Sequence, residues 1–143
     1  MFFRIVEFQL LLFAFFVNLF WEAAQARLFV FKEQSSFASL TRCLLFCSSV
    51  DAVMMLLAFW VVSAFAKNRC WFLASKYYYT VAFVTTGLIL SFVSEYSVIH
   101  YRKLWEYSKL MPVIPGLELG LAPLLQWLFM PPLVLFLLVR GFR

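Results

Sequence analysis

The chain has 143 residues, of which 65% are hydrophobic and only 13% are charged. A soluble domain of this length needs much more polar surface, so the composition excludes an ordinary soluble protein. The formal net charge of +5 is spread over both ends of the apolar stretches. It therefore points to anionic lipid headgroups, and we expect no nucleic-acid partner.

Four apolar stretches are long enough to cross a bilayer, because a spanning helix needs about 20 mostly apolar residues. They cover residues 5–24, 43–66, 78–99 and 117–139. We therefore expect an all-α, polytopic membrane protein in which four transmembrane helices form an up-down bundle. The sequence contains no repeat, low-complexity tract or linker, so residues 1–143 are expected to form a single domain.

The first apolar stretch also has a feature of secretory signal peptides, since Ala24-Gln25-Ala26 imitates a cleavage site. However, Trp21-Glu22 stands just before it, where small neutral residues are expected. We therefore expect this stretch to be retained as the first helix of the bundle.

The orientation in the membrane is predicted from the basic residues, because cytoplasmic loops are rich in lysine and arginine. Lysine and arginine are equally frequent on the two sides of the predicted bundle. The short loop 67–76, however, carries three basic residues and no acidic residue. We therefore expect the side with this loop to be cytoplasmic, and an even number of spans then places both termini there.

Three of the four predicted spans carry a carboxylate inside the apolar run, namely Glu22, Asp51 and Glu95. At a rise of ~1.5 Å per residue, tracing the chain back and forth places all three in the half of the bilayer away from the termini. A charge at this depth is costly, so such residues usually face the interior of a bundle and have a function. We predict that the three carboxyl groups share one pocket, and we assign them as the candidate catalytic residues.

Polar residues on each span recur at the i, i+3, i+4 and i+7 spacing of one helical face. The candidate ligand-binding residues on these faces and in the following loop are Asn18, Trp21, Gln25, Ser94, Trp105, Tyr107 and Gln126. On the last span the predicted face consists of Glu118, Ala122, Gln126 and Met130. A purely structural interpretation stays open, because Ser, Asn and Gln also hydrogen-bond between membrane helices. It explains Asn18 well but three carboxylates poorly, since helix association does not need ionisable groups.

The segment 101–111 between the third and fourth spans has the pattern of an amphipathic helix. One face would hold Tyr101, Leu104, Trp105, Ser108 and Met111, and the other face would hold Arg102, Lys103, Glu106 and Lys109. We expect this segment to lie in the membrane interface. It is either a lid over the carboxylate pocket or an anchoring belt. The ring of Trp105 decides between these, because an anchoring tryptophan faces lipid at the headgroup level.

Two sets of possible metal ligands are weak. His100 together with the three carboxylates would give a hard, oxygen-rich site. Cys43 and Cys47, one helical turn apart, would give a soft one. An interfacial histidine and small buried cysteines are the simpler interpretations, so we predict no metal and no cofactor.

Five blocks of the sequence carry a resemblance to a known family. They are N-L-F-W-E-A-A-Q at 18–25, Cys47 with Asp51, Ser94-Glu95, W-E-Y-S-K-L-M-P at 105–112 and G-L-A-P-L-L-Q-W at 120–127. They are similar to a family of small four-helix bacterial membrane proteins that has no assigned activity. The resemblance covers most of the chain, although the family usually has glycine where this chain has Val50 and does not include His100. It implies a protein of the bacterial inner membrane.

Three classes of function remain. The first is a membrane-embedded enzyme or binding site for a lipid-like or small apolar ligand, because desolvated carboxylates can exchange protons near neutral pH. Tyr107 and Gln126 would be donors in such a site. The second class is a proton-coupled or metal/ion transporter, which would need a homo-oligomer because four helices are too thin to surround an aqueous path. The third is an accessory subunit of a larger membrane complex; membrane lipids are expected partners in each case.

The carboxylate cluster generates a first testable prediction. At least one of the three side chains should carry a proton near neutral pH, because burial and neighbouring negative charges disfavour the ionised form. Infrared titration of the carboxyl stretch should show a protonated band at pH 7 that changes in Asp51→Asn. If all three groups ionise near their ordinary values of about 4, the prediction is wrong.

Overall fold

A computed structural model of the chain describes the backbone of residues 2–31 and 36–142 and the side chains of 5–30 and 36–142. Three basic residues that enter the predicted balance between the two sides lie outside the described side chains, namely Arg4, Lys32 and Arg143.

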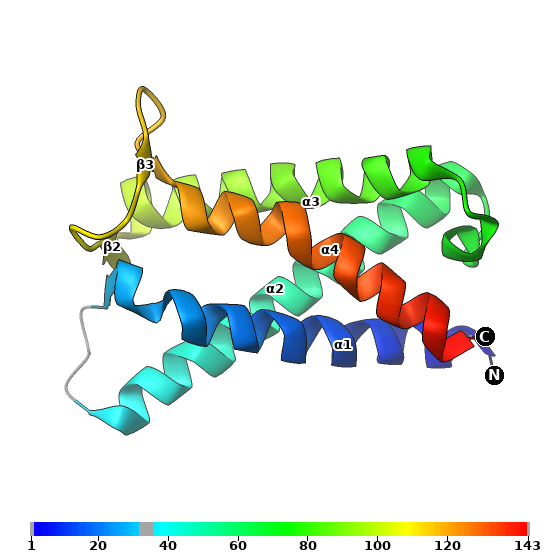
Figure 1. The fold of residues 1–143 in the computed structure, drawn as a ribbon, viewed down its shortest axis with the longest axis horizontal. Coiled ribbons are helices and arrows are strands. Elements are labelled where there is room, and N and C mark those ends of the chain that lie inside the picture. Colours follow the sequence, from blue (N-terminus) through cyan, green and yellow to red (C-terminus); the bar gives the residue numbers. More distant parts are fainter. Residues whose placement is uncertain (1, 32–35, 143) are drawn as a thin grey trace.

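Four long helices make up most of the structure (Figure 1). They are α1 (Phe2–Gln25), α2 (Phe37–Ala66), α3 (Tyr77–Ser97) and α4 (Leu121–Phe142). All four are long and apolar enough to cross a membrane, which confirms the predicted four-span, multi-pass helical bundle. Large apolar side chains such as Phe20 and Phe65 stay exposed on its outer faces, where lipid would cover them.

The four helices pack so that α1 and α3 each contact both α2 and α4. In Figure 1, α2 and α4 run obliquely between the roughly parallel α1 and α3, and both termini lie at the same end of the bundle. That end is filled by an apolar core, whose largest fully buried members include Leu10, Met55, Phe59, Trp71, Phe83 and Leu138. Trp71 belongs to the short 3-10 helix η2 (Trp71–Ala74) and donates a hydrogen bond to Ser63 Oγ (3.1 Å).

Helix α2 begins at Phe37 and not at the predicted residue 43. Its first turn is closed by a capping box, in which Ser36 Oγ accepts from the Ser39 N–H (3.2 Å) and Ser39 Oγ accepts from the Ser36 N–H (3.3 Å). These paired bonds satisfy N–H groups that a helix start leaves open. A prediction based on hydropathy misses this part of the helix because Ser39, Thr41 and Arg42 interrupt the apolar residues there.

The segment 101–111 is not an amphipathic helix, so that prediction is wrong. Helix α3 continues into a wider π-helical turn, η3 (Val98–Arg102), and ends at Lys103, whose φ is 49°. The chain then forms strand β2 (Trp105–Tyr107), which pairs antiparallel with β1 (Phe29–Phe31) beyond α1 and the short 3-10 helix η1 (Ala26–Leu28). The strand period of two places Trp105 and Tyr107 on one face, with Glu106 exposed on the other.

Helix α4 begins at Leu121, later than the predicted residue 117. A small hairpin precedes it, formed by β3 (Val113–Ile114) and β4 (Leu119–Gly120). Its turn needs positive φ angles at Gly116 (89°) and Glu118 (53°), which a helix cannot supply. Glu118 is therefore an exposed turn residue and does not belong to the polar face of the last helix, contrary to the prediction.

A close contact between α3 and α4 at Gly87 generates a second prediction. A Cβ added at Gly87 would lie 2.6 Å from Cε3 of the buried Trp127 ring. Gly87→Ala should therefore cost about 1–3 kcal/mol of stability through overpacking, although alanine favours a helix. Thermal unfolding in detergent measures this, with Gly141→Ala as the control, since there the nearest atom, Gln9 Oε1, is 3.4 Å away. Equal melting temperatures for the two variants would contradict the close contact.

Candidate functional site

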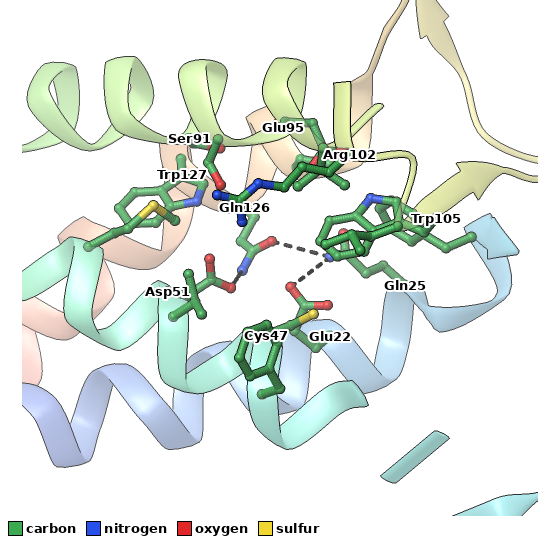
Figure 2. A pocket seen from close by; sticks show the side chains of 18 residues that line it. Glu22, Gln25, Cys47, Asp51, Ser91, Glu95, Arg102, Trp105, Gln126 and Trp127 are labelled. Carbon is green, nitrogen blue, oxygen red and sulfur yellow. Dashed lines mark hydrogen bonds between the residues drawn. The ribbon is translucent and has the colours of Figure 1, made fainter. Parts of the chain in front are cut away.

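A cavity of about 160 Å³ lies near the end of the bundle away from the termini, and all three carboxylates line it (Figure 2). Glu22 comes from α1, Asp51 from α2 and Glu95 from α3. Glu22 and Asp51 are buried, whereas Glu95 is half-buried. The structure therefore brings together, from three different helices, the three side chains that the sequence placed at one depth.

Helix α4 forms the fourth wall of the cavity through Gln126. The side-chain amide of Gln126 forms hydrogen bonds with residues of both α1 and α2. Gln126 Nε2 donates to Asp51 Oδ2 (2.8 Å) and to Asn18 Oδ1 (2.9 Å). Its Oε1 accepts from Gln25 Nε2 (3.2 Å), and that same nitrogen donates to Glu22 Oε1 (3.1 Å). Gln126 is 2% exposed, so these bonds are shielded from solvent and lipid.

The bonds form one chain of side-chain amides that runs from Trp21 to the carbonyl of Ala14. Trp21 Nε1 donates to Gln25 Oε1 (2.8 Å), and Asn18 Nδ2 donates to the Ala14 carbonyl (2.8 Å). An indole N–H can only donate and a backbone carbonyl can only accept. Each amide between these two ends therefore has a single favourable orientation. In that orientation the nitrogen of Gln25 faces Glu22.

The third carboxylate is held by the strand that follows α3. Tyr107 Oη donates to Glu95 Oε1 at 2.8 Å, and the Trp105 side chain also interacts with Glu95. Burial, and after it the nearby charge of Glu95, raises the pKa of the Tyr107 phenol. The phenol therefore keeps its proton and acts as a donor to Glu95.

The predicted ligand-binding residues occupy two positions relative to the cavity. Four of them line it, namely Gln25, Ser94, Trp105 and Gln126. The other three, Asn18, Trp21 and Tyr107, lie behind the lining and hydrogen-bond to it. Their predicted role in binding therefore changes to one of positioning.

The indole ring of Trp105 faces protein and not lipid. It is half-buried, lines the cavity and packs edge-on against Phe29, with the ring centroids 6.3 Å apart. Phe29 lies on β1 and also packs against Tyr107 at 5.7 Å. This orientation favours the lid over the anchor, although the segment is a two-stranded ribbon and not a helix.

Arg102 is a cavity residue that the sequence reasoning placed on a solvent-facing surface. It lies in the π-helical turn after α3 and lines the cavity, and in Figure 2 its side chain extends over Gln126 toward Ser91. Within the described part of the chain it forms no ion pair within 4.0 Å. The signal was present, because Arg102 follows Glu95 at the i+7 spacing of a helical face.

The weak metal hypotheses gain no geometric support. His100 is exposed and packs against Tyr96, with ring centroids 4.3 Å apart, and it does not line the cavity. Cys47 does line the cavity. Among the described residues, no group of three His, Cys, Asp or Glu side chains is placed to hold a metal ion.

Comparison with protein-family models, with curated proteins and with solved structures gave no match to this chain.

The amide chain generates a third prediction. Gln126→Leu removes both donors and the acceptor of Gln126 and leaves buried partners on α1 and α2 unsatisfied, which should cost about 1–3 kcal/mol. Gln9→Leu is the matched control, because the buried Gln9 Oε1 has no hydrogen-bond partner among the described residues. We expect the melting temperature in detergent to fall clearly in the first variant and to change little in the second. Equal shifts would show that the amide chain does not stabilise the bundle.

Proposed function

We propose that the protein is a membrane-embedded binding protein for a lipid-like or small, mostly apolar ligand. The polar group of this ligand would meet the carboxylates Glu22, Asp51 and Glu95, which are placed to exchange a proton with it. The observation that supports this proposal is that three carboxylates from three helices line one cavity together with apolar side chains. These are Phe29, Phe46, Val50, Met54, Val98, Leu104 and Pro123.

The hydrogen bonds already formed in the cavity limit the kind of polar group that a ligand can bring. Both Nε2 hydrogens of Gln25 are used, one on Glu22 and one on Gln126, and both of Gln126 are used on Asn18 and Asp51. The carboxylates keep further oxygen lone pairs, because each carboxylate has about four acceptor sites. Next to these three carboxylates, a group that donates hydrogen bonds, such as a hydroxyl or an ammonium group, fits better than one that only accepts.

The packing at the other end of the bundle supports a closed binding site rather than a transport path. Below the cavity, the interior is filled by an apolar core that includes the fully buried Leu10, Met55 and Phe59. Ions and polar solutes need polar groups or water along their route, whereas the buried members of this core are hydrophobic side chains. We therefore rank the transporter and the accessory subunit below the binding site.

We further propose that the chain resides in a bacterial inner membrane with both termini in the cytoplasm. The basic loop 67–76 supports this orientation. It would place the carboxylate cavity in the extracytoplasmic half of the bilayer, within reach of ligands in the outer leaflet of that membrane.

Three probes with the same ten-carbon tail test the binding site, and they give a fourth prediction. Decylamine and decanol can donate hydrogen bonds to carboxylates, whereas decanoate cannot at neutral pH. We expect decylamine and decanol to raise the melting temperature of the detergent-solubilised protein more than decanoate does, because decanoate can bind only Arg102 and is repelled by the carboxylates. Losing a charge-assisted hydrogen bond should weaken decylamine binding to Asp51→Asn or Glu95→Gln roughly tenfold.

The control variant is Glu7→Gln at the opposite end of α1, where Glu7 Oε1 pairs with Arg69 Nη1 at 3.1 Å. It removes one carboxylate from a membrane span but leaves the cavity unchanged, so probe binding should match that of the wild type. The melting temperature of each variant without probe reports folding separately. Equal binding of all three probes would reject the proposed site. So would a loss of decylamine binding in Glu7→Gln as large as that in Asp51→Asn or Glu95→Gln.

A further inference from the structure

The cavity has an opening on one side of the bundle. The lining residues that α1 and α4 contribute are all buried, namely Glu22, Gln25, Pro123, Gln126 and Trp127. The exposed members of the lining are Phe46, Leu104 and Arg102, and Phe46 is 64% exposed. Phe46 lies on α2, and the other two follow α3. The opening therefore lies between α2 and the end of α3.

This opening faces the lipid close to the membrane interface. Helix α2 has 30 residues and is about 45 Å long at 1.5 Å per residue, which exceeds the ~30 Å hydrocarbon core. Its first turns, which carry Ser39, Thr41 and Arg42, can therefore stand in the headgroup region. Phe46 is the fourth residue of the apolar run 43–66, so it lies where lipid headgroups give way to acyl chains.

The size of the cavity limits what can enter it. Pockets that enclose drug-sized ligands measure roughly 300–1,000 Å³, whereas this cavity measures about 160 Å³. It has room for a lipid headgroup but not for the acyl chains. The tail of a bound lipid would leave through the opening and pass along Phe46.

The charges around the cavity suit a headgroup with two opposite charges. The carboxylates Glu22, Asp51 and Glu95 contribute to its walls, and Arg102 reaches in from the rim (Figure 2). A simple amine would leave the guanidinium of Arg102 without an anion, and a simple phosphate would meet the carboxylates as a like charge. Arginine binds phosphate through its planar fork of donors, and carboxylates accept hydrogen bonds from an ammonium group.

We propose that the cavity binds the headgroup of a zwitterionic aminophospholipid that enters from the surrounding leaflet between α2 and α3. The ammonium group lies among Glu22, Asp51 and Glu95, and the phosphate lies at Arg102. This inference rests on the proposed carboxylate binding site, and it adds the class of ligand and its route of entrance.

Native mass spectrometry of the full chain in detergent tests the ligand class. Phosphatidylethanolamine and phosphatidylglycerol with identical acyl chains are added separately, and the bound fractions are compared. We expect phosphatidylethanolamine to be retained at least fivefold better, and this preference to fall to about twofold or less in Glu95→Gln. Arg102→Gln should instead lower the retention of phosphatidylethanolamine itself several-fold, because it removes the partner of the phosphate that both lipids carry. The control Arg140→Gln, at the far end of α4, should keep the wild-type preference.

Two results would overturn the ligand class. They are equal retention of both lipids by the wild type, and undiminished retention of phosphatidylethanolamine in Arg102→Gln. Selective decylamine binding in the same preparation would then leave the proposed carboxylate site intact, so the two failures are distinguishable. If free phosphoethanolamine displaces the lipid at equal concentration, the site recognises a soluble headgroup and the membrane route is wrong.

Photocrosslinking tests the route. Phosphatidylethanolamine with a diazirine near the start of one acyl chain should label Phe46 or Leu104 several-fold more than Phe65. Phe65 is 74% exposed near the other end of α2 and reports contact with bulk lipid. The same diazirine on phosphatidylglycerol should show no such preference. Equal labelling of these positions by the aminophospholipid would overturn the opening between α2 and α3.

Discussion

The site depends on one chain of hydrogen-bonded amides that joins α1 to α4. It begins at the indole N–H of Trp21, passes through Gln25, Gln126 and Asn18, and ends at the carbonyl of Ala14. Because its first group only donates and its last only accepts, the direction of every bond between them is set. The two glutamine nitrogens thereby each keep one N–H for a carboxylate. The hydrogen bonds that hold α1 against α4 therefore also position the carboxylates.

The two ends of the bundle have opposite characters. At the terminal end, Trp71 and its aromatic neighbours fill the interior, as in a well-packed core. At the other end α2 diverges from α3, and the ribbon of β1 and β2 lies beside the space that remains. Tyr107 in this ribbon holds Glu95, so the short strands complete the polar cavity that the helices leave open.

Segment 98–120 shows why the local sequence pattern was insufficient to predict the structure between α3 and α4. Its apolar residues suit an amphipathic helix, but β1 lies more than 70 residues earlier in the chain and offers an edge of free backbone groups. Pairing with that edge satisfies backbone N–H and C=O groups, which a prediction from one segment cannot anticipate. The π-helical turn before it presents Arg102 to the cavity, whereas the predicted helix placed Arg102 on the polar face, opposite Trp105.

The sequence by itself determined four membrane-spanning helices and the common depth of Glu22, Asp51 and Glu95, because hydropathy and a rise of ~1.5 Å per residue are local properties. It also indicated which polar residues share a helical face. Only the tertiary structure decided that Gln126 links Glu22 and Asp51 through Gln25, that Trp105 faces the cavity, and that the opening lies between α2 and α3. These features depend on how distant segments meet, and contacts between distant segments leave no periodic signal in a single chain.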